Sequence, residues 1–344
     1  MHLRGRFFSI LNMLSLLGEK VCKMTRFPKI FLLVLFLVGH VLASEMAVKI
    51  GDGTVDEAVA KNDSVWVQKF DEKFSLRFLC DYTLWSVWNT AYGNEALVSN
   101  SPVSLGLGFA YDDLFTLFGV SWDISWDFTM SLFLGSDEES SKIDAFETGL
   151  DLFPGKFWIE IWLSYYSGFS VKTEQDGKMV RRFSDLNFFE MYVSALWMLT
   201  SKDKFSPRSA YFLDRRQTHS AGSWIFGGRF QGNIVEDPDS LLTFYEGERV
   251  LSSIWGNVGY TYTWVFENGF FGNIWLDIGL VYGINNEDEY TVMPQPDFKT
   301  AWGYIGKKWS WNIVVEAEYN AFSYKSYWEQ KLIVKGGILV VRRF

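Results

Sequence analysis

The chain has 344 residues, of which 18% are aromatic and 21% are charged, and its formal net charge is −9. A soluble globular domain of this size carries more charge and hides most of its large rings, so the composition indicates that many rings face a medium other than water. The negative charge argues against a nucleic-acid partner, because binding to phosphates needs an excess of Lys and Arg.

The N-terminal segment has the pattern of a secretory signal peptide. Arg26 and Lys29 precede an apolar run from Ile30 to Val38, and small residues follow at Val41-Leu42-Ala43. A positive flank, an apolar centre and a small-residue cleavage site are typical of such signals. We therefore expect residues 1–43 to be removed, with Met24 as an alternative start. The other interpretation is a retained anchor, but the run is shorter than the roughly 20 residues of a spanning helix.

The segment that follows the cleavage site is acidic. Residues 44–72 contain many Asp and Glu side chains and precede the first alternating stretch, which predicts a periplasmic N-terminal arm. Cys80 would be the one cysteine left after cleavage, so an internal disulfide could not stabilise the mature chain.

From residue 73 onward, apolar and polar side chains alternate with a period of two. The clearest case runs from Val120 to Leu134, and the pattern recurs in Val103–Tyr111, Phe189–Leu199, Ile274–Tyr282 and Trp311–Tyr319. Alternation over about ten residues is the signature of outer-membrane strands. Since an unpaired amide in hydrocarbon costs several kcal/mol, such strands must close on themselves. We predict that residues 73–344 form an all-β, closed antiparallel transmembrane barrel.

Short and long connections take turns along the chain, as such barrels require. Short links are expected at residues 112–113, 154–156, 201–204, 267–269 and 307–308, and long ones at 91–102, 135–141, 171–185, 235–249, 284–297 and 323–330. This division gives about thirteen strand candidates, whereas a closed barrel needs an even number. We predict about 12 strands, within a range of 10–14. The stretch from Arg208 to Ser220 is then either continuous with the next strand or outside the membrane.

The last predicted strand, Lys331–Phe344, ends on an aromatic residue. A terminal Phe344 on an alternating strand resembles the signal read by the outer-membrane barrel assembly machinery, which is therefore an expected partner. Arg342 departs from that pattern, since an apolar residue is usual two positions before the end.

Three short stretches carry a resemblance to a known family. They are Lys73-Phe74-Ser75-Leu76-Arg77, Ser101 to Phe109 (SPVSLGLGF), and Ser220-Ala221-Gly222-Ser223. Together they resemble the bacterial family catalogued as domain of unknown function 4421, and the similarity extends over nearly the whole mature chain. The resemblance implies an exported outer-membrane barrel of a Gram-negative bacterium and brings no biochemical activity with it.

If the apolar stripes face lipid, the acidic residues between them point into the lumen. A ring of carboxylates would favour cations in a pore. The alternative is a packed polar interior in which bases, bound ions or raised pKa values neutralise the acids. The candidates are Asp81, Asp123, Asp127, Glu147, Asp151, Glu160, Glu190, Asp277, Glu316 and Glu318.

Basic residues gather around position 215, at Arg208, Arg215, Arg216 and Arg229. They could contact an anion or the phosphates of lipopolysaccharide. The simpler interpretation is that they pair with nearby acids, because the guanidinium fork suits carboxylates equally well.

His219 is the last histidine in the chain and is followed by Ser220, a pair that invites comparison with barrel phospholipases. Neighbours on an extended chain point to opposite faces, so these two cannot form the required hydrogen bond. We therefore expect no enzyme activity and no catalytic residues. A single histidine without cysteine partners also argues against a metal site, and nothing in the sequence calls for a cofactor.

The sequence thus predicts an outer-membrane barrel that acts as a narrow, cation-favouring channel or transport barrel. Two alternatives remain: a structural or adhesive protein whose external loops contact ligands, and, less favoured, a lipid hydrolase. The expected partners are the bilayer and lipopolysaccharide, with small solutes or ions as candidates for passage.

Overall fold

The structure, a computed structural model, describes residues 65–89, 96–99, 103–117, 120–131, 145–175, 178–200, 202–237, 247–266, 269–285, 290–323 and 328–344. The predicted signal peptide and most of the predicted N-terminal arm lie outside this part of the chain. Strands dominate it, and its helix is the short α3 (Arg208–Tyr211). Among the described residues, no helix has the length and apolar character needed to cross a membrane.

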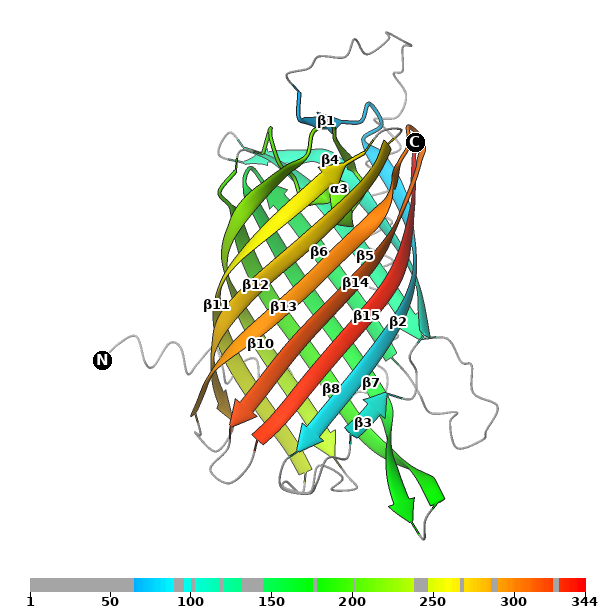
Figure 1. Cartoon of the computed structure of the whole chain (residues 1–344), viewed down its shortest axis with the longest axis vertical. Coiled ribbons are helices and arrows are strands. Elements are labelled where there is room, and N and C mark those ends of the chain that lie inside the picture. The colour runs from blue at the N-terminus through cyan, green and yellow to red at the C-terminus, as the bar shows by residue number, and fades with distance from the viewer. Residues whose placement is uncertain are drawn as a thin grey trace, which may run out of the picture. The chain divides into compact units, whose positions relative to one another are not determined.

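Twelve long strands pair in antiparallel fashion and close into a barrel (Figure 1). They are β2 (Phe74–Asn89), β4 (Val103–Leu117), β5 (Val120–Ser131), β6 (Ala145–Pro154), β7 (Phe157–Gln175), β8 (Lys178–Met198), β10 (Ala221–Asp237), β11 (Gly247–Val265), β12 (Phe270–Asn285), β13 (Tyr290–Ile305), β14 (Trp309–Ser323) and β15 (Trp328–Arg343). The last strand pairs with the first, from Glu329 opposite Asn89 to Arg343 opposite Ser75. The predicted all-β class and the count of twelve are confirmed.

Three shorter strands complete the described sheets. β3 (Ala96–Ser99) pairs with β2 on one side and with β7 on the other. β1 (Val67–Lys69) pairs with β9 (Arg215–Gln217) in a separate two-stranded sheet.

The two faces of the wall differ as the alternation predicts. On β12, Leu276, Ile278 and Leu280 are each more than half exposed on the outside, whereas Trp275 is 1% exposed inside. The same exposed apolar surface continues around the barrel, with polar and charged side chains buried within. A closed sheet with an apolar outer wall leaves no unpaired edge and suits hydrocarbon. The protein is an outer-membrane β-barrel.

One end of the barrel carries the tight turns and the carboxyl terminus. Gly155 and Gly269 have positive φ values of 66° and 85° there, a conformation that glycine adopts without steric cost. Short turns face the periplasm in barrels of this type, so we call this the periplasmic end.

The predicted link at residues 112–113 is wrong. Both residues belong to β4, whose pairing with β5 shifts register between Tyr111 and Phe115. Asp113 has a φ of 54°, and its backbone amide donates to the Asp123 carboxylate at 2.7 Å. A bulge of this kind places turn-favouring residues inside a strand, which explains why two aspartates looked like a turn.

Some strands run further than the alternation does. The predicted loop at 171–185 belongs largely to β7 and β8, which stay paired as far as Gln175 and Lys178. The predicted loop at 284–297 contains the start of β13 at Tyr290. Backbone pairing does not depend on which face is apolar, so a sheet can continue where alternation has ended.

The stretch after β8 folds into the barrel, contrary to both predictions for it. We call residues 205–217 the insert. Phe205 and Leu213 are at most 1% exposed, and the apolar cluster that holds them includes side chains from β6, β7, β8, β10, β12, β13 and β15. The wall buries the insert, so this stretch neither continues β10 nor lies outside the barrel.

Candidate functional site

Five charged residues anchor the insert to the wall. Arg208 donates through Nε to both carboxylate oxygens of Asp214 at 3.0 and 3.1 Å, and its Nη2 lies 2.8 Å from Asp112. Arg208 also contacts Asp123 through Nη1, and Arg215 bridges Asp112 and Asp123. These side chains are nearly all buried, which makes every charge costly unless it is paired. We call this group the anchor cluster.

The pKa values in the insert follow from this pairing. Burial raises the pKa of the Asp214 carboxyl, but the attraction of Arg208 and Arg215 outweighs it and holds that pKa below its ordinary value of 3.8. Burial opposes the charge on Arg208, but Asp214, Asp112 and Asp123 raise its pKa above the ordinary value. Asp214 and Arg208 are therefore both charged at neutral pH.

Hydrogen bonds with the wall fix the rest of the insert. The Tyr211 hydroxyl donates to Asn273 at 2.5 Å, and the Asn312 amide donates to the Ala210 carbonyl at 2.6 Å. Leu213 has a φ of 58°, which a residue with a Cβ rarely adopts, and its carbonyl accepts from Arg343. The wall thus holds the insert in a conformation that its own sequence disfavours.

The end of the N-terminal arm is attached to the insert. Val67, Gln68 and Lys69 pair with the three residues of β9. The Thr218 amide donates to the Trp66 carbonyl at 2.9 Å, and the Trp66 ring stacks on His219 at 5.0 Å between centroids. A displacement of this part of the arm would therefore act directly on the insert.

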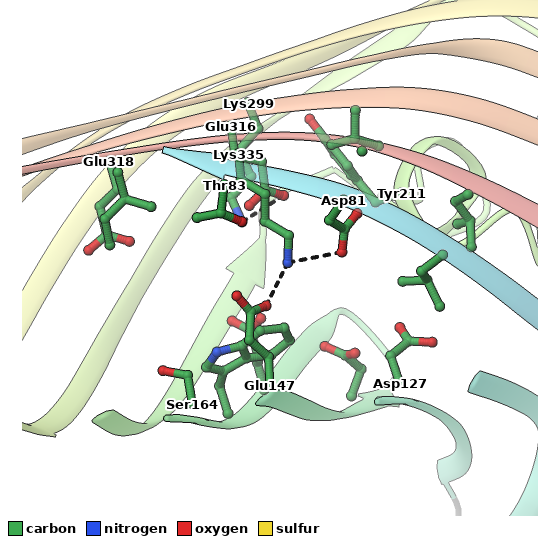
Figure 2. Close-up of a pocket in the computed structure, with 18 of the residues that line it drawn as sticks. Asp81, Thr83, Asp127, Glu147, Ser164, Tyr211, Lys299, Glu316, Glu318 and Lys335 are labelled. Atoms are coloured by element: carbon green, nitrogen blue, oxygen red, sulfur yellow. Dashed lines mark hydrogen bonds and ion pairs between the residues drawn. The ribbon is translucent and has the colours of Figure 1, made fainter. Parts of the chain in front are cut away.

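The lumen beside the insert holds a cavity of about 210 Å³. Tyr211 and Phe212 of the insert contribute to its lining, with three basic and seven acidic side chains of the wall (Figure 2). The basic residues are Arg77, Lys299 and Lys335, and the acidic ones are Asp81, Asp127, Glu147, Asp151, Glu160, Glu316 and Glu318. Carboxylates therefore outnumber the cations of the cavity wall.

Lys335 lies between two of these carboxylates. Its Nζ donates to Glu147 at 2.6 Å and lies 3.3 Å from Asp81 (Figure 2). Arg77 lies 2.8 Å from Asp127. Asp151 and Glu160 are directly opposite on β6 and β7, and Asp151 accepts from the Trp158 indole at 2.7 Å. The Lys335 ammonium is thus shared by two carboxylates, and Asp151 and Glu160 form a second pair of neighbouring acids.

Aromatic faces complete the cavity wall. Trp162 lies across Gly149, where an added Cβ would be only 2.5 Å from the indole ring, so the glycine makes room for it. The Lys335 ammonium is 5.3 Å from the Trp162 ring centre, and that of Lys299 is 5.9 Å from Trp158. Both distances fall within the range of cation–π attraction.

Seven of the ten acidic candidates line this cavity. Of the other three, Asp123 belongs to the anchor cluster, Glu190 accepts from Lys331 at 2.9 Å, and Asp277 lines a small side cavity. Several of the acids have basic partners, as the packed-interior interpretation expects, but the cavity keeps its acidic excess. Within the described residues, no group of three or more His, Cys, Asp or Glu side chains is placed to hold a metal ion.

The four basic candidates do not form one cluster. Arg208 and Arg215 meet in the anchor cluster, whereas Arg216 donates to the Ile305 carbonyl at 2.6 Å. Arg229 lies well along β10, 3.6 Å from Glu318 and stacked over Tyr192 and Trp255. The strand rises about 3.4 Å per residue, so Arg229 is carried far from the insert.

His219 and Phe344 lie at the periplasmic end. Thr218 Oγ1 is 2.9 Å from His219 Nδ1, while the Ser220 hydroxyl accepts from the Val265 amide at 2.9 Å. Phe344 is about half exposed, and its amide donates to the Phe74 carbonyl at 3.0 Å. The terminal residue thus extends the seam between the first and last strands.

Sequence reasoning missed Asp112, Asp297 and Lys299. The sequence prediction places Asp112 in a turn and Asp297 in a loop, and it assigns no role to Lys299. Lys299 lies between Phe298 and Thr300 on β13, so the alternation of that strand, once extended backwards, could have placed its side chain inside.

Residues 61–344 match the family described as "Domain of unknown function (DUF4421)". The chain belongs to this family. The resemblance seen in the three short motifs is thereby confirmed. The DUF4421 description names no activity, and no protein with a curated description matches this DUF4421 chain.

Several solved outer-membrane barrels are similar to this DUF4421 chain, at low sequence identity. The translocator domain of autotransporter NalP from Neisseria meningitidis has 12% identity and a TM-score of 0.42, with coverage of 90% of this chain and 96% of that one. An outer membrane channel from Pseudomonas putida F1 has 10% identity and a TM-score of 0.39, with coverage of 83% and 100%.

Proposed function

We propose that this protein is a cation-favouring transport barrel whose lumen is closed at the periplasmic end by the insert. The observation that supports it most is the excess of carboxylates in the cavity, seven against three bases. Fixed charges of one sign in a narrow, low-dielectric space concentrate ions of the opposite sign. Anions would meet repulsion along the same wall.

The position of the insert supports the closed state. Its apolar side chains pack with seven strands of the wall, and its charged side chains bind β4 and β5. Passage would therefore require the insert to move, which would expose its apolar side chains and break the ion pairs of the anchor cluster. The barrel itself can stay intact while this happens.

Single-channel recording in planar bilayers tests the proposal. We expect rare or small current steps from the wild type, and more frequent or larger steps from Arg208→Met, which loses one of the two cations of the anchor cluster. Under a KCl gradient the reversal potential of Arg208→Met should show cation preference. The double variant Asp151→Asn/Glu160→Gln, placed on the Arg208→Met background, should reduce that preference.

Asp113→Asn on the same background is the matched control, because Asp113 is a partly exposed carboxylate of the periplasmic end that does not line the cavity. Silence of both wild type and Arg208→Met in well-inserted protein would contradict the proposal. So would anion preference.

A second candidate function is adhesion or partner contact at the outer end. The hairpin of β7 and β8 supports it, since pairing from Phe169 to Gln175 carries the two strands past their last pairings with the neighbouring long strands (Figure 1). Deleting residues 172–181 should abolish binding of intact cells to glycan or protein surfaces while leaving the conductance of Arg208→Met unchanged. Unaltered cell binding would remove this candidate.

Two partners follow from the barrel and are proposed with it. The outer-membrane assembly machinery would read the last strand and Phe344, and lipopolysaccharide would surround the outer rim. Loss of Phe344 should lower the amount of folded protein in the outer membrane, as measured by heat-modifiable migration on gels. Normal amounts of folded protein after the deletion would argue against Phe344 as the signal.

A further inference from the structure

A second, smaller cavity adjoins the main one and extends the site towards β13. It has a volume of about 20 Å³ and shares Trp158, Glu160 and Lys299 with the main cavity, while Asp277 and Asp297 line its other side. A volume of this size holds one group about as large as a water molecule. An ammonium group is of that size.

Asp297 is an unused acceptor in this side cavity. It is 9% exposed, and its Oδ1 accepts no hydrogen bond from any residue that the structure describes. It stands directly opposite Asp277 on β12 and Glu318 on β14, so three carboxylates share one level of the wall. A buried carboxylate oxygen without a partner is costly, and a bound donor would remove that cost.

The bases that line the side cavity with Asp297 are Arg229 and Lys299, and their ion pairs within 4 Å are with other carboxylates. Arg229 lies 3.6 Å from Glu318, and Lys299 lies 3.6 Å from Glu316. Both oxygens of Asp277 accept hydrogen bonds, from Asn257 at 3.4 Å and from the Trp275 indole at 2.7 Å. Asp297 is therefore the carboxylate at this level of the wall that has an oxygen left for an added ammonium.

The protein's own lysines show which chemistry the cavity wall accepts. The Lys335 ammonium is held by two carboxylates and the face of Trp162. An alkyl chain that ends in an ammonium thus fits between acids and aromatic rings in this lumen. Cation–π contacts and paired carboxylates are the features that recognise organic ammonium ligands.

We propose that the two joined cavities bind a linear aliphatic polyamine, with one ammonium beside Asp297 in the side cavity and the chain along the aromatic wall of the main cavity. The inference rests on the proposed cation preference and names the class of cation. Acids line both cavities, so an alkyl chain with a charge near each end can meet carboxylates in both. A compact metal ion finds no set of three ligands among the described residues.

Isothermal titration of the detergent-solubilised, folded protein with spermidine at 150 mM NaCl tests the inference. We expect saturable binding, at least tenfold weaker in Asp297→Asn and unchanged in Asp113→Asn. Butylamine, with one ammonium, and MgCl₂, with a compact double charge, should both bind at least tenfold more weakly than spermidine. Folding of each variant is verified by heat-modifiable migration, and Asp297→Ser replaces Asp297→Asn if the latter does not fold.

Absence of spermidine binding would overturn the inference, as would an equal loss in Asp297→Asn and Asp113→Asn, which would indicate general electrostatic attraction. Equal binding of MgCl₂ would also overturn it. The two proposals can fail separately. Cation-selective current from Arg208→Met without spermidine binding rejects the polyamine alone, whereas spermidine binding without any current rejects transport and leaves the binding site.

Discussion

Arg208 and Asp214 lie six residues apart and face each other inside the barrel, with Nη2 of the arginine 2.6 Å from Oδ2 of the aspartate. This contact turns the insert back on itself around α3. The same guanidinium forms ion pairs with Asp112 and Asp123 on the wall. One side chain thus stabilises the conformation of the insert and binds the insert to the barrel.

Replacing Arg208 by Met should release the insert while the barrel remains folded. Three buried carboxylates lose a partner, and breaking such a buried network costs about 3–5 kcal/mol. Hydrogen exchange followed by mass spectrometry should show faster exchange at residues 205–217 and unchanged exchange in β12. Arg216→Met, which removes a single contact to a carbonyl, serves as control. Unchanged exchange of the insert in Arg208→Met would contradict the role of the anchor.

Acid should weaken the insert through Asp214. Because the pKa of this carboxyl is below its ordinary 3.8 in the folded protein, its ionised form stabilises the insert at any pH above 3.8. That contribution is lost as the pH falls from 3.8 through the lower folded value. Tryptophan emission should report the change, since the ring centres of Trp158 and of Phe212 in the insert are 5.3 Å apart. Asp214→Asn should lack this transition. An identical acid transition in that variant would assign it to other groups.

Replacing Leu213 by Ala should lower the free energy of unfolding more than the same replacement of a leucine on the outer wall. It is fully buried in the apolar cluster, and Leu→Ala substitutions at such sites cost about 2–5 kcal/mol. Leu107 is 60% exposed on the outside, so Leu107→Ala makes the matched comparison. Urea unfolding from lipid vesicles, with tryptophan emission as the probe, gives both values. A smaller loss for Leu213→Ala than for Leu107→Ala would contradict the packing of the insert.

The stacking of Trp66 on His219 should couple the N-terminal arm to the insert. Aromatic pairs contribute about 0.5–1.5 kcal/mol beyond their area burial. A double-mutant cycle of Trp66→Ala and His219→Ala, read from exchange at residues 215–217, should give a coupling energy in that range. Additive effects would mean that the rings do not cooperate. We also expect the wild type and His219→Ala to release phospholipid at the same background rate. A lipase activity of the wild type that His219→Ala loses would support the hydrolase alternative.

Much of the wall could be predicted from the sequence because its signal is local. Alternation along stretches such as Ile274–Tyr282 reports lipid on one side and a polar interior on the other, and closure follows from the cost of unpaired amides. The seven acids of the cavity were found by the same logic, since inward positions are fixed once the outward stripe is known.

The insert could not be predicted, because its signal is not local. The partners of Arg208 on the wall, Asp112 and Asp123, are 96 and 85 residues away in sequence. Nothing in the spacing of Arg208, Arg215 and Arg229 tells which of them meet. Asp297 was missed for a different reason, since it lay in a predicted loop although β13 begins at Tyr290 and alternates through this residue.

Oxygen accessibility of nitroxide labels along β12 tests the membrane barrel most directly. In a Cys80→Ser background, single cysteines at residues 274 to 282 are labelled in turn in lipid vesicles. We predict high accessibility to oxygen at Ile274, Leu276, Ile278, Leu280 and Tyr282, and low accessibility at the positions between them. Accessibility to a water-soluble nickel chelate at the five outward positions, or a period of 3.6 residues, would contradict a strand with one face in lipid.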